Sequence, residues 1–174
     1  GARPFDADRS GMHLSEGAAL LLLEKSQHPQ QRAMAKILGA GLSCDALHAT
    51  SPHPEGRGAA RAMTAALAAA GLQAADIDYI NLHGTGTRIN DAAEARAVHT
   101  VFDPNMPLLS SIKGAAGHSL AAAGAIEAGV CARAVADGFA PANAGLEKPD
   151  PELGLFPLKE PRHERIRTVL SNSF

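Results

Sequence analysis

The residues with the clearest chemical potential form the run His83-Gly84-Thr85-Gly86-Thr87, which directly follows an apolar stretch. A strand that ends in a glycine-rich loop is a common place for a binding or catalytic site in an α/β protein. The glycines let the backbone approach a ligand closely, and the threonines supply hydroxyl groups. The same residues also fit a tight turn with a solvated histidine. A phosphate-binding loop fits less well, because the GxGxxG spacing and a following Walker lysine are missing.

A second group of residues, Lys113 and His118, flanks the sequence Gly114-Ala115-Ala116-Gly117 at the expected start of a helix. A helix N-terminus stabilises negative charge that develops on a bound molecule. The pair therefore fits chemistry in which an anion forms. A surface lysine and a histidine in the first helical turn are the more ordinary interpretation of these two residues alone.

Asp91 and Glu94 lie three residues apart on the helix expected after the His83 loop, so their side chains share one face. As a general acid and base they form a weak candidate pair. A solvated helix face is the usual explanation for such carboxylates. A third interpretation is that they orient Lys113.

The bulk composition is that of one globular domain, with 174 residues, 45% of them hydrophobic, and a net charge of −2. No basic stripe with aromatic platforms appears, so we expect no nucleic-acid partner. Cys44 and Cys131 are far apart, which argues against a disulfide scaffold or a zinc site and suits a reducing, cytoplasmic location. The longest apolar stretch, 120–136, is interrupted by Glu127 and Arg133, and is too short to span a membrane.

Apolar runs and turn residues indicate an α/β layered fold in which strands and helices alternate along much of the chain. The expected strands cover residues 15–24, 36–44, 79–82, 107–110 and 166–173. The expected helices cover residues 59–70, the segment from an Asn90 or Asp91 cap to about Phe102, and residues 119–136. Because the last of these helices is almost entirely Ala and Gly, we expect it to be the most buried.

Together the motifs resemble the C-terminal half of the elongating β-ketoacyl-acyl carrier protein synthases of the thiolase superfamily. Four blocks in the family's order carry this resemblance. They are Arg3-Pro4-Phe5-Asp6 with Arg9, Gly11 and Glu16-Gly17-Ala18, then His83 to Thr87 with Asn90, Asp91 and Glu94, then Ser111 to Gly124, and finally Ser171 to Phe174. Departures at Ser10, Ser15 and Arg88-Ile89 touch none of the residues that the family uses for catalysis.

The resemblance implies that residues 1–174 form the C-terminal half of a thiolase-type αβαβα sandwich, with a mixed five-stranded sheet and helices on its faces. It also implies that the chain is truncated at both ends. The family's nucleophilic cysteine belongs to an N-terminal half that this sequence lacks, and neither Cys44 nor Cys131 lies in the matching motif. We therefore expect the chain to be inactive alone.

The resemblance also implies roles for particular residues. His83 and His118 would donate hydrogen bonds to the malonyl thioester oxygen, and their side chains should converge although the residues are far apart in sequence. Lys113 would hold His118, within hydrogen-bond reach of His118 or Glu94. Asp91 and Glu94 would surround Lys113. Thr85 and Thr87 would contact the pantetheine arm, and Phe174 would act as a mobile gate.

The activity implied is decarboxylative Claisen condensation of malonyl-acyl carrier protein with an enzyme-bound acyl chain, in fatty-acid or polyketide biosynthesis. The expected partners are acyl carrier protein, the missing N-terminal half, and a second subunit in a homodimer or ketosynthase heterodimer. No cofactor or catalytic metal is implied beyond the phosphopantetheine on the substrate, although the family sometimes holds a structural monovalent cation near residues such as Glu16 or Glu127. The alternatives are a non-catalytic chain-length-factor-like subunit and, less well supported, a degradative thiolase or an initiating synthase.

Overall fold

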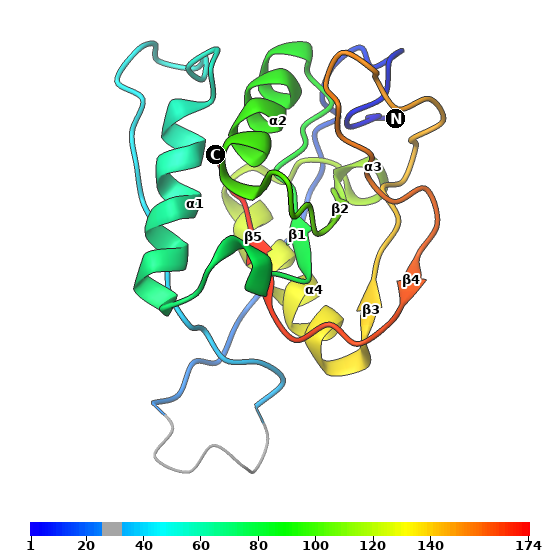
Figure 1. Ribbon diagram of the computed structural model, residues 1–174. Coiled ribbons are helices and arrows are strands. Elements are labelled where there is room, and N and C mark those ends of the chain that lie inside the picture. Colours follow the sequence, from blue (N-terminus) through cyan, green and yellow to red (C-terminus); the bar gives the residue numbers. More distant parts are fainter. Residues whose placement is uncertain (26–32) are drawn as a thin grey trace.

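A three-stranded parallel sheet lies at the centre of the computed structural model, which describes residues 1–25 and 33–174 (Figure 1). The strand order is β2-β1-β5, with β1 at Tyr79–Asn81, β2 at Leu108–Ser110 and β5 at Val169–Ser171. Because the strands are parallel, their carboxyl ends meet at one edge of the sheet. A separate antiparallel pair is formed by β3, Phe139–Ala140, and β4, Arg162–His163.

Helices cover both faces of this sheet. Helices α1, Arg57–Ala70, and α2, Arg88–Phe102, pack together on one face, and α4, Ala123–Asp137, lies on the other (Figure 1). The single helical turn α3, Lys113–Ala116, follows β2. Short 3₁₀ turns at Ala74–Asp76 and Leu120–Ala122 precede β1 and α4. The result is the expected α/β layering.

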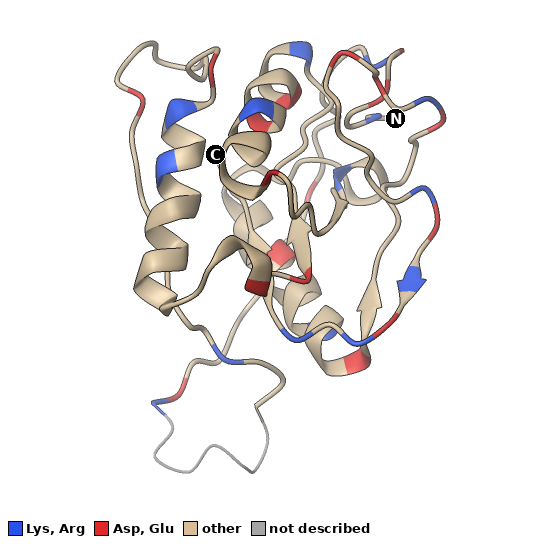
Figure 2. Cartoon of the chain, viewed as in Figure 1, with Lys and Arg blue, Asp and Glu red and all other residues tan. Residues whose placement is uncertain are grey.

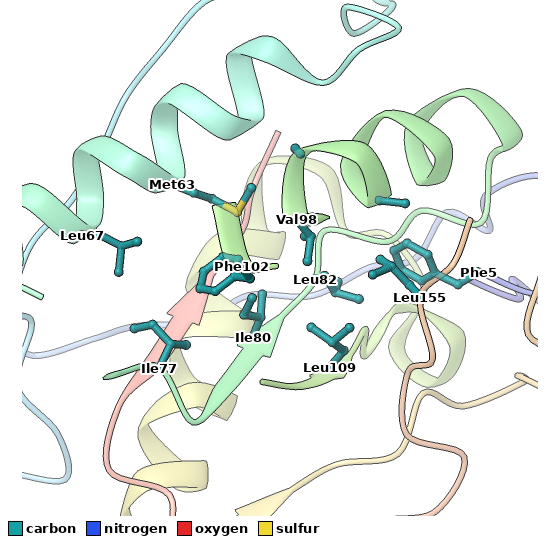
Figure 3. Packing of buried hydrophobic residues seen from close by; sticks show 12 residues of the cluster. Phe5, Met63, Leu67, Ile77, Ile80, Leu82, Val98, Phe102, Leu109 and Leu155 are labelled. Atoms are coloured by element: carbon teal, nitrogen blue, oxygen red, sulfur yellow. The ribbon is translucent and has the colours of Figure 1, made fainter. Parts of the chain in front are cut away.

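Alternating side chains of β1 build two apolar layers. Ile80 points toward α1 and α2, where it joins a buried cluster with Met63 and Phe102 (Figure 3). Tyr79 belongs to a second cluster on the α4 side, with Ala134. This alternation is the two-residue period of a strand with both faces buried. Complete burial of each large apolar side chain contributes about 1.5–3 kcal/mol to folding.

Local sequence explains where the main helices begin and end. Thr87 caps α2, since its Oγ1 accepts a hydrogen bond from the Asn90 backbone N–H at 3.2 Å. The expected caps, Asn90 and Asp91, lie inside the helix instead. Gly71 and Gly138 end α1 and α4 in the left-handed conformation, at φ of 68° and 62°.

Two of the five expected strands, 15–24 and 36–44, are not strands in the structure. The prediction of one mixed five-stranded sheet was therefore wrong in its detail. A strand requires a hydrogen-bonded neighbour along its length. Segment 15–24 is preceded by only an isolated bridge between Leu14 and His118. Segment 36–44 lies against α1 instead, where a Cβ added to Gly41 would come within 2.0 Å of the Ala62 carbonyl oxygen.

The most buried helix is α2, and the prediction for residues 119–136 was wrong in this respect. Helix α2 has seven buried residues and is held between α1 and the sheet, whereas α4 has three. Small side chains permit close packing on every side, but tertiary neighbours decide whether it occurs. The helix also begins four residues later than expected, at Ala123, because Leu120–Ala122 form a separate 3₁₀ turn before it.

The distribution of charge agrees with the composition. In the view of Figure 2, Lys and Arg are interspersed with Asp and Glu along the chain, and no region is reserved for one sign. Among the described residues, no helix is both long and apolar enough to cross a lipid bilayer.

Candidate active site

His83 directly follows Leu82 at the carboxyl end of β1, and its side chain is almost completely buried, with 4% exposed. The next residue, Gly84, has φ of 41°, and a Cβ there would lie 2.6 Å from the Ser111 Cβ. Only glycine therefore fits this close approach between the loops that follow β1 and β2. The approach brings the two motif-bearing loops side by side.

His118 follows α3 and reaches the same place from the other loop. The rings of His83 and His118 have centroids 5.3 Å apart and planes at 85°, an edge-to-face arrangement. This contact confirms the expected convergence of two residues far apart in sequence. A hollow of about 520 Å³ lies elsewhere, on the outer side of α2, lined in part by Leu47 and Ile89, and neither histidine borders it.

Lys113 is buried beneath the His83 ring. Its Nζ donates to the His83 carbonyl oxygen at 2.6 Å, lies 3.3 Å from His83 Nδ1, and forms an ion pair with Glu127. The expectation that Lys113 would reach His118 or Glu94 was wrong. The physical reason is that Glu127 of α4 points into the same interior, and a buried ammonium requires a buried counter-charge.

The partners of the two rings indicate their protonation. The Leu120 backbone N–H donates to His118 Nδ1 at 3.1 Å, so the ring proton of His118 lies on Nε2. The Lys113 ammonium has only donors, so His83 Nδ1 accepts and Nε2 again carries the proton. Burial, followed by the charge of Lys113 and the neighbouring His118, lowers the pKa of His83 to about 3. Burial and Lys113 also lower the pKa of His118. Both rings are therefore neutral donors.

Asp91 and Glu94 hold the backbone of the His83 loop. Glu94 accepts from the backbone N–H groups of His83 at 2.7 Å and Gly84 at 2.8 Å. Asp91 accepts from the N–H groups of Gly86 at 3.2 Å and Phe5 at 2.8 Å. The expectation that they surround Lys113 was wrong, because both carboxylates instead accept hydrogen bonds from buried backbone N–H groups, which need partners. Burial raises the pKa of both carboxyls, and hydrogen bonds oppose that rise.

The two threonines of the loop lie next to each other. Thr85 is buried, with 4% exposed, and its Oγ1 lies 3.0 Å from the Thr87 Oγ1. The Thr87 hydroxyl is also the cap of α2. Their hydroxyls thus organise the loop, and contact with a substrate arm stays a prediction.

Phe174 packs its ring against His83, with centroids 5.7 Å apart, while 48% of the side chain is exposed. The segment that follows β5 therefore borders the His83 ring. Its role as a mobile gate stays a prediction.

Neither cysteine has the character of an activated nucleophile. Cys44 is exposed, and its neighbour Arg61 donates only to its carbonyl oxygen. Cys131 belongs to α4, and burial raises the pKa of its thiol to about 11. A thiol with such a pKa is protonated at neutral pH and is a poor nucleophile.

Sequence reasoning missed two residues of this arrangement. Glu127 was not named as part of the site, and it is the counter-ion of Lys113. Asn172 donates through Nδ2 to Glu94 Oε1 at 3.0 Å. An acidic residue in a helix of small apolar residues was the available signal for Glu127. The signal for Asn172 was its place inside the fourth block of the resemblance, Ser171 to Phe174.

A model of the family described as "Beta-ketoacyl synthase, C-terminal domain" matches residues 34–147, more than half of the sequence. The chain belongs to the β-ketoacyl synthase family. Across 182 aligned residues it is 43% identical to the mitochondrial 3-oxoacyl-[acyl-carrier-protein] synthase of Arabidopsis thaliana, covering 99% of this chain and 40% of that synthase.

Solved ketosynthase structures share the fold of this chain. It superposes on the ishigamide ketosynthase/chain length factor with a TM-score of 0.90 and 38% identity, covering 98% of this chain and 43% of that one. A type II polyketide ketosynthase in complex with its acyl-carrier protein, AntDE:AntF, gives a TM-score of 0.92 and 29% identity, over 98% and 43% of the two chains. The thiolase-type fold is thereby shown, and the chain spans about two fifths of the length of these relatives.

Proposed function

We propose that this chain supplies the decarboxylation site of a β-ketoacyl-acyl carrier protein synthase, an acyltransferase that performs decarboxylative Claisen condensation. The observation that carries the proposal is the edge-to-face contact of His83 and His118, whose Nδ1 atoms both have partners and whose Nε2 atoms have none among the described residues. Since both rings are assigned as neutral, each Nε2–H can donate. Two such donors suit an oxygen on which negative charge develops.

In the proposed reaction, an acyl chain first moves from a carrier-protein thioester to a cysteine thiolate. A malonyl thioester then loses CO₂, and the electron pair of the broken carbon–carbon bond becomes an enolate, with its negative charge largely on the thioester oxygen. His83 and His118 donate to that oxygen. The enolate carbon attacks the acyl-cysteine carbonyl, a carbon–carbon bond forms, and the thiolate leaves. Removal of one such donor costs about 10²–10³ in rate.

The remaining candidates are proposed to position these groups. Lys113 fixes the tautomer of His83 by donating toward Nδ1, and Glu127 keeps the lysine in place. Asp91 and Glu94 hold the backbone of the loop. Thr85, Thr87 and Phe174 are proposed to border the pantetheine arm and the acyl chain.

The nucleophile is proposed to come from a preceding half of the protein, since neither Cys44 nor Cys131 fits that role. The partners proposed are acyl carrier protein and a second ketosynthase subunit, in a homodimer or a heterodimer. The AntDE:AntF complex with its acyl-carrier protein supports the first of these. The cytoplasmic location expected from the sequence is also proposed.

A structural monovalent cation remains a proposal, and two buried oxygens are its candidate ligands. Asn81 Oδ1 and Glu127 Oε2 are buried and have no hydrogen-bond partner among the described residues. Oxygen ligands of this kind suit hard cations. These two residues would hold such an ion, whereas Glu16 is exposed and is left out. The reaction itself is proposed to need no cofactor beyond the substrate's phosphopantetheine.

A chain-length-factor-like subunit is the second candidate, supported by the similarity to the ishigamide ketosynthase/chain length factor. The buried Lys113, with its partners His83 and Glu127, favours the enzyme, because a non-catalytic subunit has no chemical need for this arrangement. The residue at the nucleophile position of the complete protein distinguishes the two: a cysteine supports the enzyme, and a glutamine the partner subunit.

The test uses the complete protein that contains this chain, with His83→Ala, His118→Ala and the surface control His163→Ala. We expect the first two variants to lose CO₂ release from malonyl-acyl carrier protein by at least about 10²-fold, while some acyl transfer to cysteine persists. The control should retain both steps. CO₂ release at the parental rate in both site variants would refute the proposal. Acylation of the isolated chain at Cys44 or Cys131 at an enzymatic rate would refute the missing nucleophile.

A further inference from the structure

Asn172 lies directly after β5 and two residues before Phe174, in a place that no part of the proposed mechanism uses. Its side chain is buried, with 3% exposed. Its backbone N–H donates to the Asn81 carbonyl oxygen at 2.9 Å, which continues the β1–β5 pairing. Its Nδ2 donates to Glu94 Oε1 at 3.0 Å. The side chain thus faces α2 from the carboxyl end of the sheet.

The Glu94 carboxylate accepts hydrogen bonds from the segments that follow two neighbouring strands, β1 and β5. Oε1 accepts from His83 N–H at 2.7 Å as well as from Asn172, and Oε2 accepts from Gly84 N–H at 2.8 Å. One carboxylate on α2 therefore ties the end of β1 to the end of β5. Because Asn172 and His83 share the same oxygen, a change in one contact alters the geometry of the other.

We propose that Asn172 is a positioning residue for His83, which it acts on through Glu94. This inference rests on the proposed function, since it assigns Asn172 to the same reaction. The segment after β5 then holds His83 in two ways, by the hydrogen bonds through Glu94 and by the Phe174 ring 5.7 Å from the imidazole. A shift of the segment after β5 would therefore displace His83, the proposed oxyanion donor, through both contacts.

The charge state of Glu94 makes this arrangement measurable. Burial raises the pKa of Glu94 to about 7, the three hydrogen bonds oppose that rise, and the nearby Asp91 carboxylate adds to it. The α1 residue Met63 faces the Asn172 amide with its sulfur. His83 stays neutral on the other side, beside the Lys113 charge. A protonated Glu94 has less capacity to accept, so one of the three donors loses its partner.

The experiment compares Asn172→Ala with the parent in the complete protein, measuring CO₂ release against pH. Loss of a donor to a carboxylate raises the pKa of that carboxyl, so we expect the acid limb of kcat to move to higher pH by about one unit. At pH 7, close to the parental pKa of Glu94, we expect kcat to fall about fivefold with KM nearly unchanged. Asn172→Ser, which keeps a hydroxyl donor, should recover part of the loss.

A double-mutant cycle with Glu94→Gln tests the route. If Asn172 acts through Glu94, Asn172→Ala should change kcat by less than about twofold in the Glu94→Gln background. Asn143 serves as a buried amide control near the same loop: its Nδ2 donates to the Pro4 carbonyl oxygen at 2.9 Å and its Oδ1 accepts from the Ser111 N–H at 2.8 Å, and no hydrogen bond joins it to Glu94 among the described residues. Asn143→Ala is expected to leave the acid limb in place. Full additivity, or an unmoved acid limb in Asn172→Ala, would overturn the inference.

A direct titration separates this inference from the proposed function. Carbon-13 NMR of the Glu94 carboxyl should give a higher pKa in Asn172→Ala, and in the more nearly isosteric Asn172→Asp, than in the parent. The His83 amide signal should follow the same titration. An unchanged Glu94 titration overturns the role of Asn172 even where CO₂ release is normal. If the parent itself releases no CO₂, the proposed function fails, and the titration still decides the inference.

Discussion

The His83 imidazole is neutral because its surroundings exclude a second proton. Burial removes the water that would solvate a charged imidazolium, and the positive charge of the Lys113 ammonium repels the positive charge that such a ring would carry. A neutral ring keeps a donor at Nε2 without carrying charge into the site. The same reasoning applies more weakly to His118, which is only partly buried.

Nitrogen-15 NMR of the histidine rings checks this state. At pH 7 we expect both His83 and His118 to be neutral Nε2–H tautomers, and His83 to stay neutral until the pH approaches 3. Because its folded pKa is depressed below 6.5, the neutral ring contributes stability that is fully present above that pH and is lost as the pH falls toward 3. A His83 signal that titrates near its ordinary pKa, or an Nδ1–H tautomer, would contradict the assignment.

Among the elements, α2 has the largest part in placing the site, because its first turns supply Thr87, Asp91 and Glu94 to the loop before it. These side chains satisfy backbone N–H groups that would otherwise be buried without partners. The loop and the helix therefore form one unit. Disruption of the first turn of α2 should change the position of His83.

Thr87→Ala removes the cap of α2, and we expect it to lower the free energy of unfolding by about 1 kcal/mol. Thr87→Ser should retain most of that stability. Thr100→Ala is the matched control in the same helix, since the exposed Thr100 hydroxyl donates only to the Arg96 carbonyl oxygen. It should be neutral or slightly stabilising because alanine is the better helix former. Urea unfolding monitored by circular dichroism measures all three, and equal losses at positions 87 and 100 would contradict the capping role.

At the scale of the whole molecule, the segments expected as strands leave apolar side chains uncovered. Leu20, Leu22 and Leu42 are 100%, 87% and 94% exposed. An extensive exposed apolar surface usually marks an interface or a liability to aggregate. The relatives of this chain are more than twice as long as it is.

The isolated chain should therefore bind the dye ANS and associate as its concentration rises. Replacement of Leu20, Leu22 and Leu42 together by Gln should reduce both signals by about half or more, because it removes apolar area without touching the buried clusters. Replacement of three exposed polar residues, Glu55, Asp76 and Glu152, by Gln serves as a control. Sedimentation velocity that finds a monomer at all concentrations, with no dye binding by the unaltered chain, would contradict this expectation.

The sequence by itself determined the family, the two loops and the residues His83, Lys113 and His118. These features depend on short runs of residue types at fixed spacing, and such runs can be recognised directly in one amino-acid sequence. The helices 57–70 and 88–102 were also recognisable, since a helix is stabilised largely by contacts between residues three and four apart.

Only the tertiary structure decided which partner each buried charge takes. Lys113 pairs with Glu127 and Glu94 with Asn172, across separations of 14 and 78 residues, and no local period encodes these distances. The same holds for the strands: an apolar run at 15–24 satisfies the pattern of a strand, but strand formation depends on a hydrogen-bonded neighbour elsewhere in the protein. Long-range contacts place the groups because burial and backbone pairing are properties of the packed molecule.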